Sequence, residues 1–199
     1  MTDNAVNKIN TRNLILVLII ISAGILRILN VGKFGEWANF TPVGAIALFA
    51  GTHFKNRWAA YITPLLTLFL SDIIVNYGYY GKITLFYEGI VWVYAAFALM
   101  VLIGSFIKHV TVLNVFFAAI GAVLIHWLVT NFGVWLGGTL YPQTFAGLVD
   151  CYIQAIPFEK NLLFGNLAYG ALLYGGFEWA KRSFPSLSNK VNWANTHNS

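Results

Sequence analysis

Long apolar runs separated by short polar segments constrain the fold of this chain more than any other feature. The runs lie at 13–30, 42–54, 58–77, 89–107, 110–137 and 161–180. A helix of about 20 apolar residues crosses the roughly 30 Å hydrocarbon core of a bilayer. Only 10% of the residues are charged, whereas a soluble domain carries about 25%. The sequence therefore predicts an all-α integral membrane protein with about six transmembrane helices.

Two segments depart from a simple membrane span. The run at 42–54 is short, since 13 residues of helix extend only about 20 Å. The segment at 141–159 is too polar to cross, and its apolar residues recur at helical spacing. The apolar face holds Phe145, Leu148, Val149, Tyr152 and Ile156, and the opposite face holds Gly147, Asp150, Cys151 and Gln154. This pattern predicts an amphipathic helix on the outer membrane surface or over the mouth of the bundle, ended by Pro157.

The loop charges predict the orientation in the membrane. One set of loops and ends carries eight basic residues: Lys8, Arg12, Lys55, Arg57, Lys108, Lys181, Arg182 and Lys190. The alternate set carries three: Lys33, Lys82 and Lys160. By the positive-inside rule, the richer set is cytoplasmic. We therefore expect a multi-pass protein of the bacterial inner membrane, with both termini in the cytoplasm, one bundle domain at 1–182 and a polar cytoplasmic tail at 183–199.

Several classes of function are not expected. The basic residues are scattered at helix ends, which disfavours nucleic acid as a partner. The single cysteine excludes an internal disulfide and a cysteine-rich metal site. The sequence shows no Ser/His/Asp set, His-x-x-x-His pair, paired carboxylates or phosphate loop, so we expect neither an enzyme nor a bound cofactor or metal.

Polar residues inside the predicted spans are the candidates for a binding site. Arg27, Asp72, Asn76, Asn131 and Asn166 fall in the outer halves of their helices, and His126 lies near the middle of its span. Ionisable groups in hydrocarbon are costly unless they are paired or face a wet cavity. Two interpretations stay open. The groups converge on a cavity open to the outside, or an Arg27–Asp72 ion pair and interhelical amide bonds simply hold the bundle.

Three local patterns add candidates, each with a plain structural alternative. Trp127, Asn131 and Trp135 recur at four-residue spacing, so they either hold a planar ligand or form part of an interfacial aromatic belt. Thr41 and Pro42 suit the N-cap and first position of a helix. That helix start either offers N–H groups to a polar ligand or packs passively.

Cys151 either coordinates or contacts a ligand, with His126 as a distant metal-binding partner, or is inert. From these patterns and the aromatic outer loops, the candidate ligand-binding residues are Asn39, Thr41, Asp72, Asn131, Trp135, Tyr141 and Cys151.

Five segments carry a resemblance to a known family. They are NFTPVGAIALFAG (39–51), LSD (70–72), TNFGVWL (130–136), YPQTFAGL (141–148) and CYIQAIPF (151–158). They resemble an uncharacterised bacterial family labelled as transport proteins, which looks like the substrate-binding (S) components of energy-coupling factor transporters. The resemblance implies a six-helix bundle that binds a vitamin near its outer face. S components dock an energising membrane module through Ala-x-x-x-Ala on the first helix, where this chain has Ser22, Ala23 and Gly24.

Two functions from different classes follow as expectations. The first is a membrane-embedded protein that takes up a small organic, vitamin-like or cofactor-precursor-like molecule from the periplasmic side. Its partners would be that ligand, the lipid bilayer and, as the resemblance implies, an energising module. The alternative is a non-transporting assembly or scaffold subunit, whose polar residues only join helices.

Overall fold

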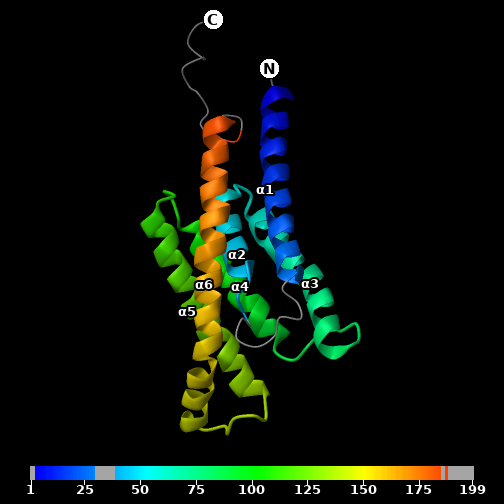
Figure 1. The fold of residues 1–199 in the computed structure, drawn as a ribbon, viewed down its shortest axis with the longest axis vertical. Helices are drawn as coiled ribbons and strands as arrows, with labels where there is room; N and C mark the ends of the chain where they lie inside the picture. The colour runs from blue at the N-terminus through cyan, green and yellow to red at the C-terminus, as the bar shows by residue number, and fades with distance from the viewer. Residues whose placement is uncertain (1–2, 30–38, 185–186, 188–199) are drawn as a thin grey trace, which may run out of the picture.

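The computed structural model describes residues 3–29, 39–184 and 187. In this part of the chain every regular element is a helix, which confirms the all-α prediction (Figure 1). The helices are α1 (Asp3–Leu29), α2 (Val43–His53), α3 (Arg57–Tyr80), α4 (Ile90–Ser105), α5 (Val112–Gly137) and α6 (Phe145–Ser183). Most of the predicted tail at 183–199, and the loop with Lys33, lie outside the described residues.

The start of α1 and the end of α6 lie at the same end of the molecule, and the α5–α6 connection lies at the opposite end (Figure 1). Arg12 joins the elements at the first of these ends. Its Nε donates to the Leu187 carbonyl at 3.1 Å and its Nη2 to the His53 carbonyl at 2.7 Å. We call this end of the molecule the terminal end and the other the α5–α6 loop end.

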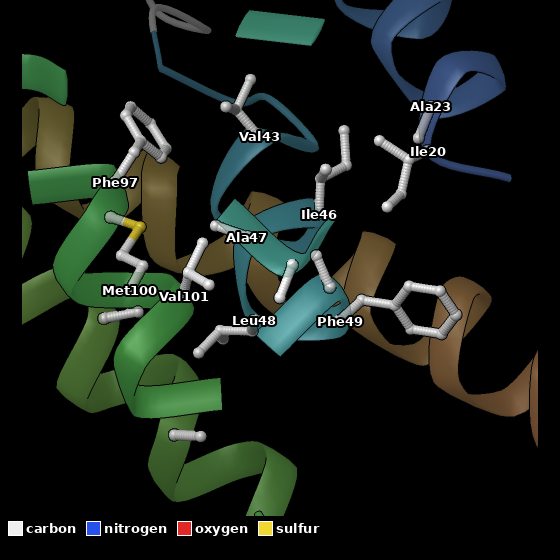
Figure 2. Close-up of a cluster of buried hydrophobic side chains, with 14 of the residues drawn as sticks. Ile20, Ala23, Val43, Ile46, Ala47, Leu48, Phe49, Phe97, Met100 and Val101 are labelled. Atoms are coloured by element: carbon white, nitrogen blue, oxygen red, sulfur yellow. The ribbon is translucent and has the colours of Figure 1, made fainter. Parts of the chain in front are cut away.

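The short helix α2 forms the centre of the bundle. Its residues from Val43 to Gly51 are buried, and it packs against all five other helices. Figure 2 shows its apolar side chains between those of α1 and α4. The backbones of α2 and α4 lie in direct contact at Gly51. A Cβ added to this glycine would lie 2.0 Å from the Val101 carbonyl oxygen. Glycine at this position therefore permits close packing of the two helices.

The helix α3 exposes a row of large apolar residues and buries polar ones, the reverse of the usual arrangement in a soluble protein. Ile62, Leu66, Leu70 and Ile74 recur every four residues and are about half exposed, at 47–56%. Ser71, Asp72 and Asn76 face the interior and are buried. By length and hydropathy, α3 and α5 are the two described helices that could each cross a membrane, while α2 and α4 are apolar but shorter.

Two local predictions about helix boundaries were wrong. Thr41 does not cap α2, because Pro42 occupies the N-cap position with φ −77° and ψ −4° and no side chain caps the helix. Pro157 does not end a separate surface helix, because α6 runs through it without a break from Phe145 to Ser183. Pro157 lies on the exposed side of α6, where its missing N–H and the carbonyl it leaves free do not disturb the packed face.

Candidate functional site

Asp72 lies in a buried polar cluster that fills the space between α1, α3 and α4. Its Oδ1 lies 2.6 Å from Arg27 Nη1, which confirms the ion pair that the sequence allowed. Arg27 Nη1 also donates to Ser71 Oγ at 2.6 Å. The hydroxyls of Tyr87 and Tyr94 each donate to Asp72 Oδ2 at 3.3 Å. Both carboxylate oxygens are therefore engaged within the protein.

Tyr87 belongs to the segment that connects α3 to α4. Burial raises the pKa of its hydroxyl, and the nearby Asp72 carboxylate raises it further. Tyr87 therefore remains a protonated hydrogen-bond donor to Asp72 at physiological pH.

The helices α5 and α6 are held together near the α5–α6 loop end by hydrogen bonds between them. Trp127 Nε1 donates to the Tyr152 carbonyl at 3.0 Å, and the Tyr152 hydroxyl donates to the Leu128 carbonyl at 2.9 Å. His126 Nδ1 lies 2.9 Å from Glu159 Oε1. We call this set of contacts the α5–α6 latch. Glu159 is buried here, although it was expected at the end of the polar outer segment 141–159.

Four of the seven candidate residues lie at or beside this latch, and the polar groups of three of them already have partners within the protein. Asn131 Nδ2 donates to the Trp127 carbonyl of its own helix at 2.8 Å, and Trp135 Nε1 donates to the Pro142 carbonyl at 2.9 Å. Cys151 Sγ donates to the Asn131 carbonyl at 3.4 Å. Tyr141 precedes Pro142 and is half-buried.

The prediction that Cys151 lies on an accessible face of its helix was wrong. The side chain is buried, with 2% of the residue exposed, and it faces α5. Phe145, from the face that was expected to be covered, is 81% exposed. His126 pairs with Glu159 and not with Cys151. Within the described residues, no three His, Cys, Asp or Glu side chains gather as a metal site.

Asn39 and Thr41 lie apart from the other candidates, before the start of α2. Asn39 is exposed and adopts a positive φ of 66°. The backbone of Thr41 packs on α6, where a Cβ added to Gly165 would lie 2.8 Å from the Thr41 carbonyl oxygen. The structure therefore distributes the seven candidates over three places and does not bring them together in one site.

Asn166 is the polar residue whose surroundings best suit a ligand. The sequence placed it among the polar residues of the spans, but it was not one of the seven candidate ligand-binding residues. It lies on α6 against the first turn of α2 and is 1% exposed. Neither Oδ1 nor Nδ2 has a hydrogen-bond partner among the described residues. A Cβ added to Gly44 would lie 2.2 Å from Asn166 Oδ1, so the amide abuts the uncapped start of α2. The only signal in the sequence was an asparagine inside an apolar span.

Asn166 lines a pocket of about 380 Å³ between the first turns of α5 and the second half of α6. We call it the α5–α6 pocket. Its lining comprises Val110, Thr111, Val112, Val115, Phe116, Asn166, Leu167, Gly170, Ala171, Tyr174, Gly175 and Glu178. None of the seven candidate residues lines it. The sequence predicted a cavity on the outer side, whereas this pocket lies on the terminal side of the latch.

Titratable groups lie beside the end of the pocket. Glu178 Oε1 lies 2.5 Å from Lys181 Nζ and 3.6 Å from His53 Nε2. The Tyr174 hydroxyl lies 2.8 Å from Thr52 Oγ1. The charge of Glu178 is thus balanced within α6, and the Tyr174 hydroxyl already has a partner.

A second pocket, of about 350 Å³, lies between α1 and α6. Its lining is apolar except for Ser22 and Tyr169, and the Ser22 hydroxyl donates to the Leu18 carbonyl of its own helix at 2.8 Å. With its serine satisfied locally, this pocket presents less hydrogen-bonding chemistry than the one at Asn166.

Comparison with known proteins gives a family without an assigned activity. The chain belongs to the family described as "Family of unknown function (DUF6580)", whose model matches residues 7–187. No curated protein and no solved structure matches it.

Proposed function

We propose that this chain is a membrane-embedded substrate-binding and transport protein of the bacterial inner membrane. It would take up a small organic molecule, of vitamin or cofactor-precursor type, from the periplasmic side. The reversed faces of α3 support the membrane part of this proposal. A row of half-exposed Ile and Leu side chains is stable in lipid, and ionisable residues inside a membrane face the bundle interior.

The observation that carries the binding function is the unpartnered amide of Asn166. Leaving a buried polar group without a hydrogen bond costs about 1–3 kcal/mol, and native proteins rarely retain such a group without a purpose. Asn166 is 1% exposed and its amide lies against Gly44, so a ligand in the pocket would reach the amide by a turn of this side chain away from α2. A ligand with a hydrogen-bonding group would satisfy this amide and recover the cost on binding.

The positions of the latch and the pocket suit a transporter that alternates between two sides. With the terminal end in the cytoplasm, the α5–α6 latch closes the periplasmic side, and the α5–α6 pocket lies on the cytoplasmic side. This arrangement would correspond to the state that releases substrate inward. Opening to the periplasm would require separation of the latch contacts made by His126, Trp127 and Tyr152.

The scaffold alternative also has a specific observation in its favour. The polar groups of Asp72, Asn131 and Trp135 are satisfied within the protein, as expected if their role is to join helices. A scaffold subunit would show no response to small molecules and would purify with a stoichiometric protein partner. Asn166 distinguishes the two functions, because joining helices does not explain its unpartnered amide.

A ligand screen tests the proposal. We expect at least one compound from a panel of vitamins and their precursors to raise the melting temperature of the detergent-solubilised protein. A ligand at 100 times its dissociation constant stabilises by about 2.7 kcal/mol. Asn166→Leu should abolish this rise, while Asn131→Leu should retain it. The opposite dependence would move the site to the latch, and indifference to the whole panel would favour the scaffold.

A further inference from the structure

Small residues leave open space in the α6 wall of the α5–α6 pocket. Gly170, Ala171 and Gly175 lie in this wall among larger residues, and a Cβ added to Gly175 would meet no atom within 4 Å. Val115 and Phe116 contribute to the α5 wall. The walls are therefore smooth and apolar, and they suit an apolar body better than a polar one.

The uncharged amide of Asn166 interrupts this apolar lining. Asn166 is the most deeply buried polar residue of the pocket, and it offers both a donor and an acceptor. The carboxylate of Glu178 is balanced by Lys181 at 2.5 Å, and the Tyr174 hydroxyl is paired with Thr52. A charged ligand group at Asn166 would be desolvated without a counter-charge, which is strongly unfavourable. The group that binds there is therefore neutral.

The mouth of the pocket opens on the side of the bundle. Val112 is 87% exposed and Phe116 is 40% exposed, and Ala171 and Gly175 on the opposite wall are exposed as well. In a membrane this side faces lipid on the terminal side of the latch. A molecule that passes through this mouth must be soluble in hydrocarbon over most of its length.

From these three features we infer that the α5–α6 pocket binds a neutral amphipathic molecule through the amide of Asn166. An amide, carbonyl or hydroxyl group of the ligand pairs with Asn166, and an apolar body of medium-chain size lies between α5 and α6. The inference rests on the proposed function, for which it names the class of ligand and the place where it binds. A bilayer lipid whose acyl chain merely fills the groove is the competing occupant.

Photolabelling of the full-length protein in lipid nanodiscs tests this inference. The probe is a ten-carbon primary amide with a diazirine in its chain, and its control is the same chain without the amide. We expect the amide probe to label 110–116 and 166–178 about tenfold more than the control, because only the amide can pair with Asn166. Asn166→Leu should reduce labelling by the amide probe to the level of the control.

A matched pair of glycine substitutions tests the place of binding. Gly175→Leu fills the pocket, whereas Gly176→Leu makes the same change at the neighbouring exposed glycine outside the lining. Neither added Cβ meets another atom within 4 Å, so both variants are expected to fold. Labelling should fall about tenfold in Gly175→Leu alone.

Equal labelling by the two probes would identify a groove for bilayer lipid and overturn the inference. Absence of amide-dependent labelling would overturn it as well, while the vitamin screen would still decide the proposed function. Labelling that requires Asn166 but survives Gly175→Leu would overturn the pocket and leave Asn166 as a binding residue.

Discussion

Replacing Asp72 by asparagine is expected to destabilise the bundle by about 3–5 kcal/mol, the typical cost of removing one partner of a buried ion pair. The Arg27 and Asp72 side chains are 16% and 5% exposed, and their nearest charged atoms lie 2.6 Å apart. Asp72→Asn would leave the Arg27 guanidinium without its counter-charge. Tyr87 and Tyr94 would also lose their charged acceptor. Thermal and denaturant unfolding of the solubilised protein measures the loss.

The double variant Arg27→Gln/Asp72→Asn is the control for this prediction. With both charges gone, much of the lost stability should return, because no uncompensated charge stays buried. If Asp72 instead contacted a ligand in a wet cavity, Asp72→Asn would leave stability nearly unchanged and abolish binding. That outcome would contradict the structural role assigned to the pair.

Asn166→Leu is expected to raise the stability of the protein, in contrast to Asp72→Asn. Leucine has the same branching and the same number of heavy side-chain atoms as asparagine, so it removes the unpartnered amide without leaving a cavity beside Gly44. We expect the ligand-free protein to gain about 1–3 kcal/mol of stability, the usual cost of a buried unsatisfied polar group. The same substitution should abolish ligand binding. Residues that lower stability while serving function show this trade-off.

Asn76→Leu provides a matched comparison. Asn76 is also buried, but its Nδ2 donates to the Thr84 carbonyl at 3.1 Å, so its replacement should destabilise the protein. The two variants therefore differ in the sign of their effect on the midpoint of unfolding. If Asn166→Leu destabilised the protein as much as Asn76→Leu, the amide of Asn166 would have a structural partner and the binding argument would fail.

Much of the fold follows from local patterns. The short element at 42–54 predicts α2, because its apolar run is too brief for a span and it starts at a proline. The pairing of Arg27 with Asp72 also follows, since two opposite charges at similar depth in hydrocarbon stabilise each other. The structure contains both features.

The orientation of α6 did not follow, because in a chain this rich in apolar residues an apolar face does not by itself indicate which side is buried. Phe145, Val149 and Ile156 were expected on a covered face, against the membrane surface or the mouth of the bundle, yet all three are exposed. Cys151 and Glu159 face α5 instead. Asn166 was recognised as a polar residue in a span, but its contact with the start of α2 at Gly44 joins residues far apart in the sequence and could not be predicted from local patterns.

The most direct test of this account is the topology of the protein in the bacterial inner membrane, because every assignment of outer and inner sides depends on it. A reporter fused after Ser199 should be active only in the cytoplasm. Reporters inserted in the connections at 81–89 and 138–144 should be active only in the periplasm. A cytoplasmic signal from 138–144, or a soluble and fully active fusion, would contradict the membrane bundle and the uptake function built on it.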